Sequence, residues 1–169
     1  MKHRNTILTA LVAIAVISFS SCKIEETNPA KDITLGSAEI QVILEANLNT
    51  TNDTTENGNY QLNNERVEGV TVTATIDKRN FYATTSGNYE DEVVSGISDA
   101  NGTVTLEVPV GENANISYRV SVSDLLVEQR TSTSVNDLPE EKVASYNSTF
   151  NVTVNKGSKE IQKLTMSLN

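Results

Sequence analysis

The chain has 169 residues and a formal net charge of −9 at pH 7, because 22 acidic residues outnumber 13 lysine and arginine residues. This charge argues against a nucleic-acid partner, since binding to phosphates requires lysine and arginine to neutralise them. The length suits one domain with a hydrophobic core of its own.

The start of the chain, residues 1–21, is predicted to be a signal peptide. The basic residues Lys2 to Arg4 precede a mostly apolar stretch from Ile7 to Phe19. That stretch is too short to cross a membrane, for which a helix needs about 20 apolar residues. A short apolar core between a basic start and small residues is typical of a cleaved secretory signal. We therefore expect the mature chain to begin at Cys22.

The residues at the cleavage position carry a more specific signal. Phe19-Ser-Ser-Cys22 resembles a bacterial lipobox in the serine-rich form found in Bacteroidota. The resemblance implies acylation of Cys22 and a lipid anchor in the outer membrane of a Gram-negative bacterium, with the domain on the cell surface or facing the periplasm. Several acyl chains anchor a protein stably, at about 0.8 kcal/mol per buried CH₂ group. The alternative is a secreted protein whose one cysteine lies near the cleavage site by chance.

Cleavage before Cys22 would also remove His3, the one histidine of the chain. The mature protein would then have no histidine and no free thiol, which excludes Ser-His-Asp and Cys-His nucleophilic sites. It also excludes ordinary zinc sites, which draw their ligands from cysteine and histidine. We therefore expect a protein that has no cofactor and is not an enzyme.

Residues 22–36 are predicted to be a polar, flexible tether, and residues 37–169 the folded domain. Apolar and polar residues alternate with period two along much of the domain, which predicts strands with one buried face. Ile161 is out of phase with the apolar residues that follow it, which predicts a bulge near residues 162–163. The predicted strands are 38–48, 67–76, 81–85, 93–97, 103–110, 116–122, 149–154 and 161–168.

The segments between these strands are predicted to be turns and loops. Residues 49–64 form a long polar loop with little to bury. Residues 99–102 (Asp-Ala-Asn-Gly) form a tight hairpin turn, since asparagine and glycine accept the positive φ that such a reversal needs. Residues 125–146 are irregular, with one helical turn that Asp137 would cap.

Seven or eight short strands joined by turns predict a single two-sheet antiparallel β-sandwich, all-β and immunoglobulin-like or transthyretin-like. Three motifs carry a resemblance: Val67-Glu-Gly-Val-Thr-Val, the run from Ser98 to Gly111 (SDANGTVTLEVPVG) and Tyr118-Arg-Val-Ser-Val. Over residues 38–168 the chain resembles a carboxypeptidase-regulatory-like or transthyretin-like domain, close in shape to Cna-B repeats. The matched positions are turn and core positions, so the resemblance implies a fold and no shared activity.

A few residues are candidates for ligand contact or modification. Tyr60, Tyr82 and Tyr89 lie at loops and could stack on a sugar ring. Asp53-Thr54-Thr55 resembles the O-glycosylation motif of Bacteroidota, which implies a glycan on Thr54.

Three acidic residues, Asp91, Glu92 and Asp99, are candidate calcium ligands, because Ca²⁺ prefers oxygen ligands. Their spacing matches no known calcium loop, so a solvated acidic turn is the simpler interpretation and we predict no metal site.

These features together predict a membrane-anchored, non-enzymatic module that binds a protein or glycan partner or has a structural role. An alternative is an accessory or anchor subunit of a pilus-like assembly, which an unpaired edge strand would favour because strand donation needs an open edge. A hydrolase that uses carboxylates alone is a third alternative and would require a pocket of clustered acids. The fold by itself decides between none of these.

Overall fold

The computed structural model describes residues 35–82, 89–111 and 115–169. They form an all-β sandwich, which confirms the predicted fold class. The predicted signal peptide, Cys22 and most of the predicted tether lie outside the described residues. Within the described ranges, no helix has the length and apolar character needed to cross a membrane. The elements are β1 (Gly36–Ala46), η2 (Thr50–Asn52), β2 (Thr54–Glu56), β3 (Asn59–Gln61), β4 (Glu65–Arg66), β5 (Thr71–Asp77), η3 (Lys78–Phe81), β6 (Asp91–Ile97), β7 (Thr103–Val110), β8 (Ile116–Val122), β9 (Leu125–Gln129), β10 (Glu140–Ser145), β11 (Phe150–Val154), β12 (Lys159–Thr165) and β13 (Ser167–Leu168).

The first main sheet has β1 at its centre, between β12 on one side and β7 with the short β4 on the other. β1 is antiparallel to β7 and parallel to β12, with Glu39 beside Lys159 and Glu45 beside Thr165. The parallel pair departs from the predicted antiparallel pattern. It arises because the turn at residues 155–158 carries the chain from β11, in the other sheet, to β12, which then runs in the direction of β1.

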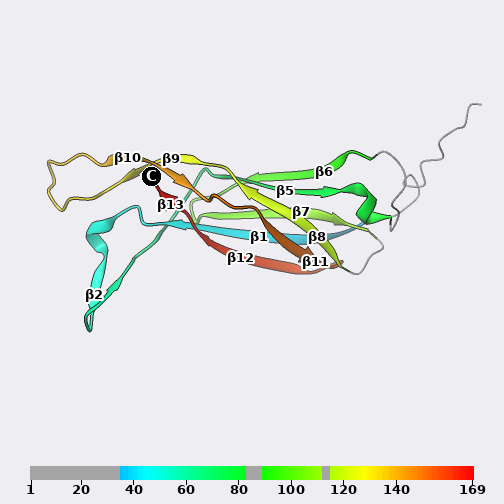
Figure 1. Ribbon diagram of the computed structural model, residues 1–169, viewed down its shortest axis with the longest axis horizontal. Helices are drawn as coiled ribbons and strands as arrows, with labels where there is room; N and C mark the ends of the chain where they lie inside the picture. Colours follow the sequence, from blue (N-terminus) through cyan, green and yellow to red (C-terminus); the bar gives the residue numbers. More distant parts are fainter. Residues whose placement is uncertain (1–34, 83–88, 112–114) are drawn as a thin grey trace, which may run out of the picture.

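The second main sheet has the strand order β11-β8-β5-β6, and its neighbouring strands are antiparallel, as predicted. The strands of both sheets run along the long axis of the molecule, and β6 forms the upper margin in Figure 1. Gly96 lets β6 lie close to β7, since a Cβ atom there would come within 2.9 Å of Val104 Cγ1 and 3.0 Å of Leu106 Cδ2.

The core lies between the two sheets and follows the alternation in the sequence. Ile40, Val42 and Leu44 of β1 are fully buried. Tyr118, which was predicted to face the core, is also fully buried, and its hydroxyl donates a hydrogen bond to the Pro109 carbonyl oxygen at 2.6 Å. Burial raises the pKa of Tyr118 above its ordinary value, so this hydroxyl remains a hydrogen-bond donor.

Two segments that were predicted to be irregular are ordered as strands. Residues 49–64 contain η2 and the hairpin of β2 and β3 instead of a featureless loop. Residues 125–146 contain β9 and β10, which pair antiparallel and form a small third sheet with β13. The predicted helical turn is wrong: Asp137 lies in a turn closed by its N–H and the Ser134 carbonyl, and nothing helical follows.

The turn at residues 99–102 forms as predicted, with Gly102 at φ 65° and its N–H donating to the Asp99 carbonyl at 2.8 Å. It is not a hairpin, however, because β6 pairs with β5 and β7 pairs with β1, so the turn joins the two sheets. The predicted strand 81–85 is wrong at its start. Phe81 ends η3, in which the Asp77 side chain accepts a hydrogen bond from the Arg79 N–H, and residues 83–85 lie outside the described ranges.

The bulge predicted near residues 162–163 is absent from β12, whose register with β1 is unbroken from Lys159 to Thr165. Ile161 is out of phase because it faces solvent, with 54% of its surface exposed.

A buried glutamate of β1 attaches β12 to its neighbour. Glu45 is 7% exposed and pairs with Arg66 of β4 and with Lys163 of β12, both at 2.8 Å.

Candidate functional site

The candidate calcium ligands do not form one site. Asp91 and Glu92 begin β6, whereas Asp99 follows its end, and eight extended residues span roughly 26 Å. Glu92 pairs with Lys78 at 3.1 Å. Asp99 accepts hydrogen bonds from the N–H groups of Thr103 and Asn101, which hold its pKa below the ordinary value. Within the described ranges, no group of three or more Asp, Glu, His or Cys residues could hold a metal ion.

The candidate tyrosines lie in two places. The rings of Tyr82 and Tyr89 stack at 5.7 Å between centroids, near the start of β6. Tyr60 lies on the β2–β3 hairpin, which Figure 1 shows at the opposite end of the molecule. Thr54, the predicted glycosylation site, is exposed at the start of the same hairpin. The structure thus brings two tyrosines together, and the third lies on the same hairpin as Thr54, opposite Thr55.

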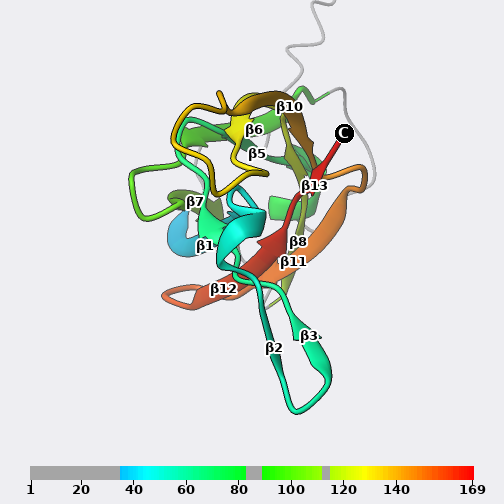
Figure 2. The ribbon, with the colours of Figure 1, turned by 90° about the vertical axis from the view of Figure 1, so that its left-hand side faces the viewer.

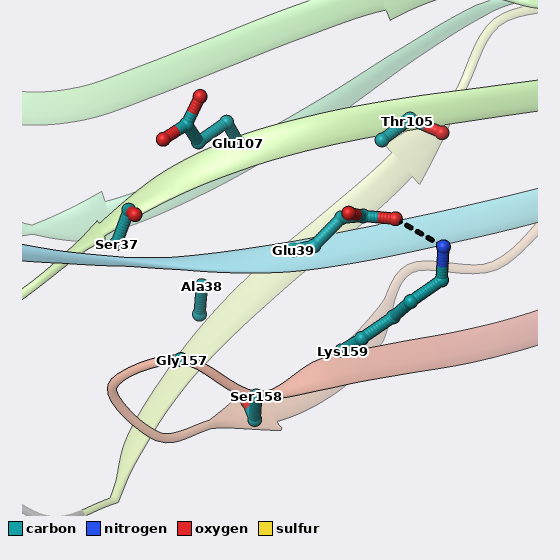
Figure 3. A pocket seen from close by; sticks show the side chains of 8 residues that line it. All are labelled: Ser37, Ala38, Glu39, Thr105, Glu107, Gly157, Ser158 and Lys159. Atoms are coloured by element: carbon teal, nitrogen blue, oxygen red, sulfur yellow. Dashed lines mark ion pairs between the residues drawn. The ribbon is translucent and has the colours of Figure 1, made fainter.

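The outer face of the first sheet has a hollow of about 300 Å³, which Figure 3 shows. Glu107, Glu39 and Lys159 form a row across β7, β1 and β12, and Glu39 pairs with Lys159 at 2.5 Å. The hydroxyl groups of Ser37, Thr105 and Ser158 complete its polar lining. Lys159 neutralises Glu39, so Glu107 supplies the one unpaired carboxylate among the lining residues. The other polar side chains of the lining could form hydrogen bonds to a ligand.

A second hollow of about 290 Å³ lies on the outer face of the second sheet. Arg119 of β8 lies in it beside Asp91 and Asn151 and has no ion pair in the described part of the chain. Asp77 borders the hollow and is paired with Arg79, which lowers the pKa of Asp77 to about 2. This face could hydrogen-bond to a sugar or a carboxylate, but the lining residues include no aromatic ring.

The third candidate is the loop end, by which we mean the end of the sandwich that carries the β2–β3 hairpin (residues 54–61) and the β9–β10 arm (residues 125–145). The hairpin turns at Asn57 and Gly58, whose φ angles of 54° and 82° match a tight two-residue turn. This Asn-Gly pair was a hairpin signal within residues 49–64 that our sequence analysis missed, because its flanking residues are polar.

Asp53 fixes the base of the hairpin. Its carboxylate accepts hydrogen bonds from the Tyr60 hydroxyl (2.5 Å), the Asn63 N–H (2.9 Å) and the Asn47 side chain (2.8 Å). These bonds, that of Tyr60 above all, hold the pKa of Asp53 below its ordinary value and raise the pKa of Tyr60. The Tyr60 ring is thereby held in place while 63% of its surface stays exposed.

The β9–β10 arm is attached to the same short segment after β1. The Arg130 N–H donates to the Leu48 carbonyl at 2.8 Å, and the Arg130 carbonyl accepts from the Thr50 N–H at 3.0 Å. The Gln129 side chain donates to the Asn47 carbonyl at 2.9 Å. Hairpin and arm therefore project from one common base, on either side of the loop end (Figure 2).

Large apolar side chains are exposed on both projections. Val135 and Leu138, in the loop of the arm, are 89% and 88% exposed, and Leu62 beside the hairpin is 54% exposed. With Tyr60 and Leu126, the loop end holds five of the nine exposed large hydrophobic residues in the described part of the chain. Apart from Tyr60, the sequence analysis did not identify these residues, because it assigned both segments to polar or irregular connections.

Comparison with known proteins adds a structural likeness. No protein-family model and no curated protein matches the chain. A search of solved structures found the shaft pilin SpaA from Lactobacillus rhamnosus GG, with 10% sequence identity and a TM-score of 0.38. The match covers 80% of this chain and 51% of the pilin chain, so this chain spans about half the pilin's length. A likeness at this level assigns no function.

Proposed function

We propose that the protein is a non-enzymatic binding module, anchored to the outer membrane by a lipid on Cys22, that contacts a partner protein through its loop end. The observation that carries this proposal is the position of the exposed apolar residues. β1 begins at one end of the sandwich and spans about 36 Å to the other, where the hairpin and the arm project. A tether before Gly36 would therefore hold the loop end away from its anchor.

The side chains at the loop end favour a protein over a glycan as the partner. Apolar side chains on projecting loops are costly to leave in water and are common at the centres of protein interfaces. Two of them, Val135 and Leu138, have almost no protein neighbours of their own. Exposed carboxylates on the arm, those of Glu128 and Glu141, favour a partner with a basic rim.

Photo-crosslinking on intact cells tests this proposal. A photo-reactive amino acid at position 135 or 138 should give one discrete protein adduct, and the same amino acid at Ile161, which is exposed on β12, should give none. Tyr60→Ser combined with Leu62→Ser should abolish the adduct from position 135. Equal labelling from Ile161, or an adduct that survives the hairpin substitutions, would overturn the assignment of the loop end.

The anchor is tested separately. The native protein should lack residues 1–21, carry the mass of acyl chains and enter the detergent phase, and Cys22→Ala should lose the acyl mass and the partition. Protease shaving of whole cells should release the domain if it faces outward. An unacylated native protein in the soluble fraction would remove the anchor and leave the loop end to be judged by crosslinking.

A second candidate function is that of an accessory or anchor subunit in a pilus-like assembly. The observation that favours it is the open edge of β6, which pairs with β5 alone among the described strands. A strand donated by a neighbouring chain would bind there through main-chain hydrogen bonds. Polymers that lengthen with protein concentration, seen by electron microscopy, would support this role, and their absence at high concentration would count against it.

A further inference from the structure

The edge strand β6 has a row of backbone groups without a hydrogen-bond partner among the described residues. In an antiparallel pair, the N–H and C=O groups of successive residues point alternately to the two sides of the strand. Just after β6, the backbone N–H of Ser98 donates to the Val70 carbonyl at 2.9 Å, and the Ser98 carbonyl accepts from the Gly69 N–H at 3.0 Å. The backbone groups of the even-numbered residues in β6 therefore point toward β5. The groups of Val93, Ser95 and Ile97 therefore point to the open edge.

The side chains of those same residues are unusually apolar for an edge. Val93 is 55% exposed and Ile97 67% exposed, with Ser95 between them on the outer face. Sheet edges in monomers are normally guarded by lysine, proline or a bulge, because an unguarded edge pairs with other chains. β6 contains no lysine and no proline, and its pairing with β5 is regular over seven residues.

From this pattern we infer that β6 pairs with β6 of a second copy of this chain, antiparallel and about a two-fold axis at Ser95. In that register Ser95 faces Ser95 of the second copy, and Val93 of each copy faces Ile97 of the other. All three pairs are residues whose backbone groups point to the open edge, so each pair exchanges two hydrogen bonds. The edge is thus complementary to itself, as a closed two-fold contact requires.

The size and charge of this contact set its strength. One strand from each copy buries much less surface than the roughly 1,200–2,000 Å² that stable complexes bury. We therefore expect a weak dimer that forms at high protein concentration. Asp91 of one copy would approach Asp99 of the other at both ends of the pair. Added salt should therefore tighten the dimer, because it screens this repulsion.

Hydrogen exchange is the first test. It uses the full chain with Cys22→Ala as a common background, so that acylation plays no part, and with β6 unsubstituted. The N–H groups of Val93, Ser95 and Ile97 should gain protection as protein concentration rises. Those of Val94 and Gly96, already bonded to β5, serve as internal controls and should not change. Unchanged exchange at Val93, Ser95 and Ile97 at millimolar concentration would overturn the inference.

A charge exchange at the two-fold axis is the second test. Ser95→Lys and Ser95→Glu should each weaken the dimer by roughly threefold to tenfold in sedimentation equilibrium, because each places like charges opposite one another. An equimolar mixture of the two variants should recover association as a heterodimer. Thr153→Lys on β11, the other edge of the same sheet, is the matched control and should dimerise like the parent.

Three outcomes would overturn the proposed pairing. The first is dimerisation that is unaffected by Ser95→Lys. The second is failure of the mixture to associate more tightly than either variant, and the third is an assembly that grows beyond two copies, which would instead indicate strand donation between successive chains. Should Ser95→Lys not fold, Val93→Thr combined with Ile97→Thr retains β-branched side chains and must still weaken the dimer.

Discussion

The edge strands β6 and β12 solve the problem of an open sheet edge in opposite ways. β12 presents Lys159 and Lys163 outward, and each pairs with a glutamate of β1, one of them the buried Glu45. β6 presents Val93 and Ile97 outward and is held by β5 and by its close approach to β7 at Gly96. The edge at β12 therefore carries lysine side chains and is attached to β1 through the buried Glu45, whereas the edge at β6 carries apolar side chains that favour pairing with another strand.

The largest expected effect comes from breaking the fastening of β12. Glu45→Gln keeps the size of the side chain but removes the negative charge that Arg66 and Lys163 share, so the free energy of unfolding should fall by about 2 kcal/mol. Chemical denaturation measures this change. Glu39→Gln breaks the exposed pair with Lys159 and should cost no more than about 0.5 kcal/mol. Equal losses in the two variants would show that burial of Glu45 has no special role.

A smaller effect is expected from moving β6 away from β7. Gly96→Val puts methyl groups against Val104 and Leu106, which must shift, and should lower the free energy of unfolding by about 1–2 kcal/mol. Ser121→Val, on the exposed outer face of β8, is the control and should stay within about 0.5 kcal/mol of the parent. An unchanged Gly96→Val variant would contradict the close approach of the two strands.

Exchanging the lysine and valine side chains of the two edge strands should change self-association while leaving the free energy of unfolding nearly constant. Lys159→Val places an apolar side chain two positions before Ile161 and removes an exposed ion pair worth no more than about 0.5 kcal/mol. Sedimentation velocity should then reveal new self-association through β12. Val93→Lys should reduce the association of β6. If neither substitution alters the sedimentation profile, edge character does not control association in this protein.

The smallest effect is a pH dependence on the β6 side of the sandwich. The Arg79 guanidinium lowers the pKa of Asp77 to about 2, below the ordinary value near 4. The stability that Asp77 contributes is therefore full above pH 4 and is lost as the pH falls from about 4 to 2. Thermal unfolding at pH 5, 3 and 2 should show a shallower decline for Asp77→Asn than for the parent. Asp124→Asn, at an exposed aspartate with no ion pair in the described residues, should follow the parent.

Two of the predicted strands have the predicted bounds, whereas the strands predicted at 38–48 and 67–76 are β1 (Gly36–Ala46) and β5 (Thr71–Asp77). The segments 103–110 and 116–122 coincide with β7 and β8, because each buries every second side chain. Leu125-Leu-Val hid the strand β9, since three consecutive apolar residues show no period. The parallel partner of β1 was beyond prediction from local sequence, because the pairing of distant strands depends on which sheet each crossover enters.

The candidate sites were predictable in part. Tyr60 was a candidate residue, but its hydrogen bond to Asp53 depends on the reversal of the chain in the β2–β3 hairpin, which was not predicted. Exposure of Val135 and Leu138 could not be read from the sequence, because an apolar residue in a loop is equally compatible with burial. The acylation of Cys22 and the glycosylation of Thr54 stay predictions.

The position of β1 has a mechanical consequence. If the chain is held before Gly36 and a partner pulls on the β2–β3 hairpin, tension passes along β1 and the few residues that follow it. β1 is already extended, so its covalent backbone carries the tension, and its hydrogen bonds to β7 and β12 keep it in place on both sides. The chain between the anchor side of Gly36 and the hairpin is therefore nearly extended already and can lengthen little under load. We therefore expect the sandwich to transmit force between anchor and hairpin without unfolding its core.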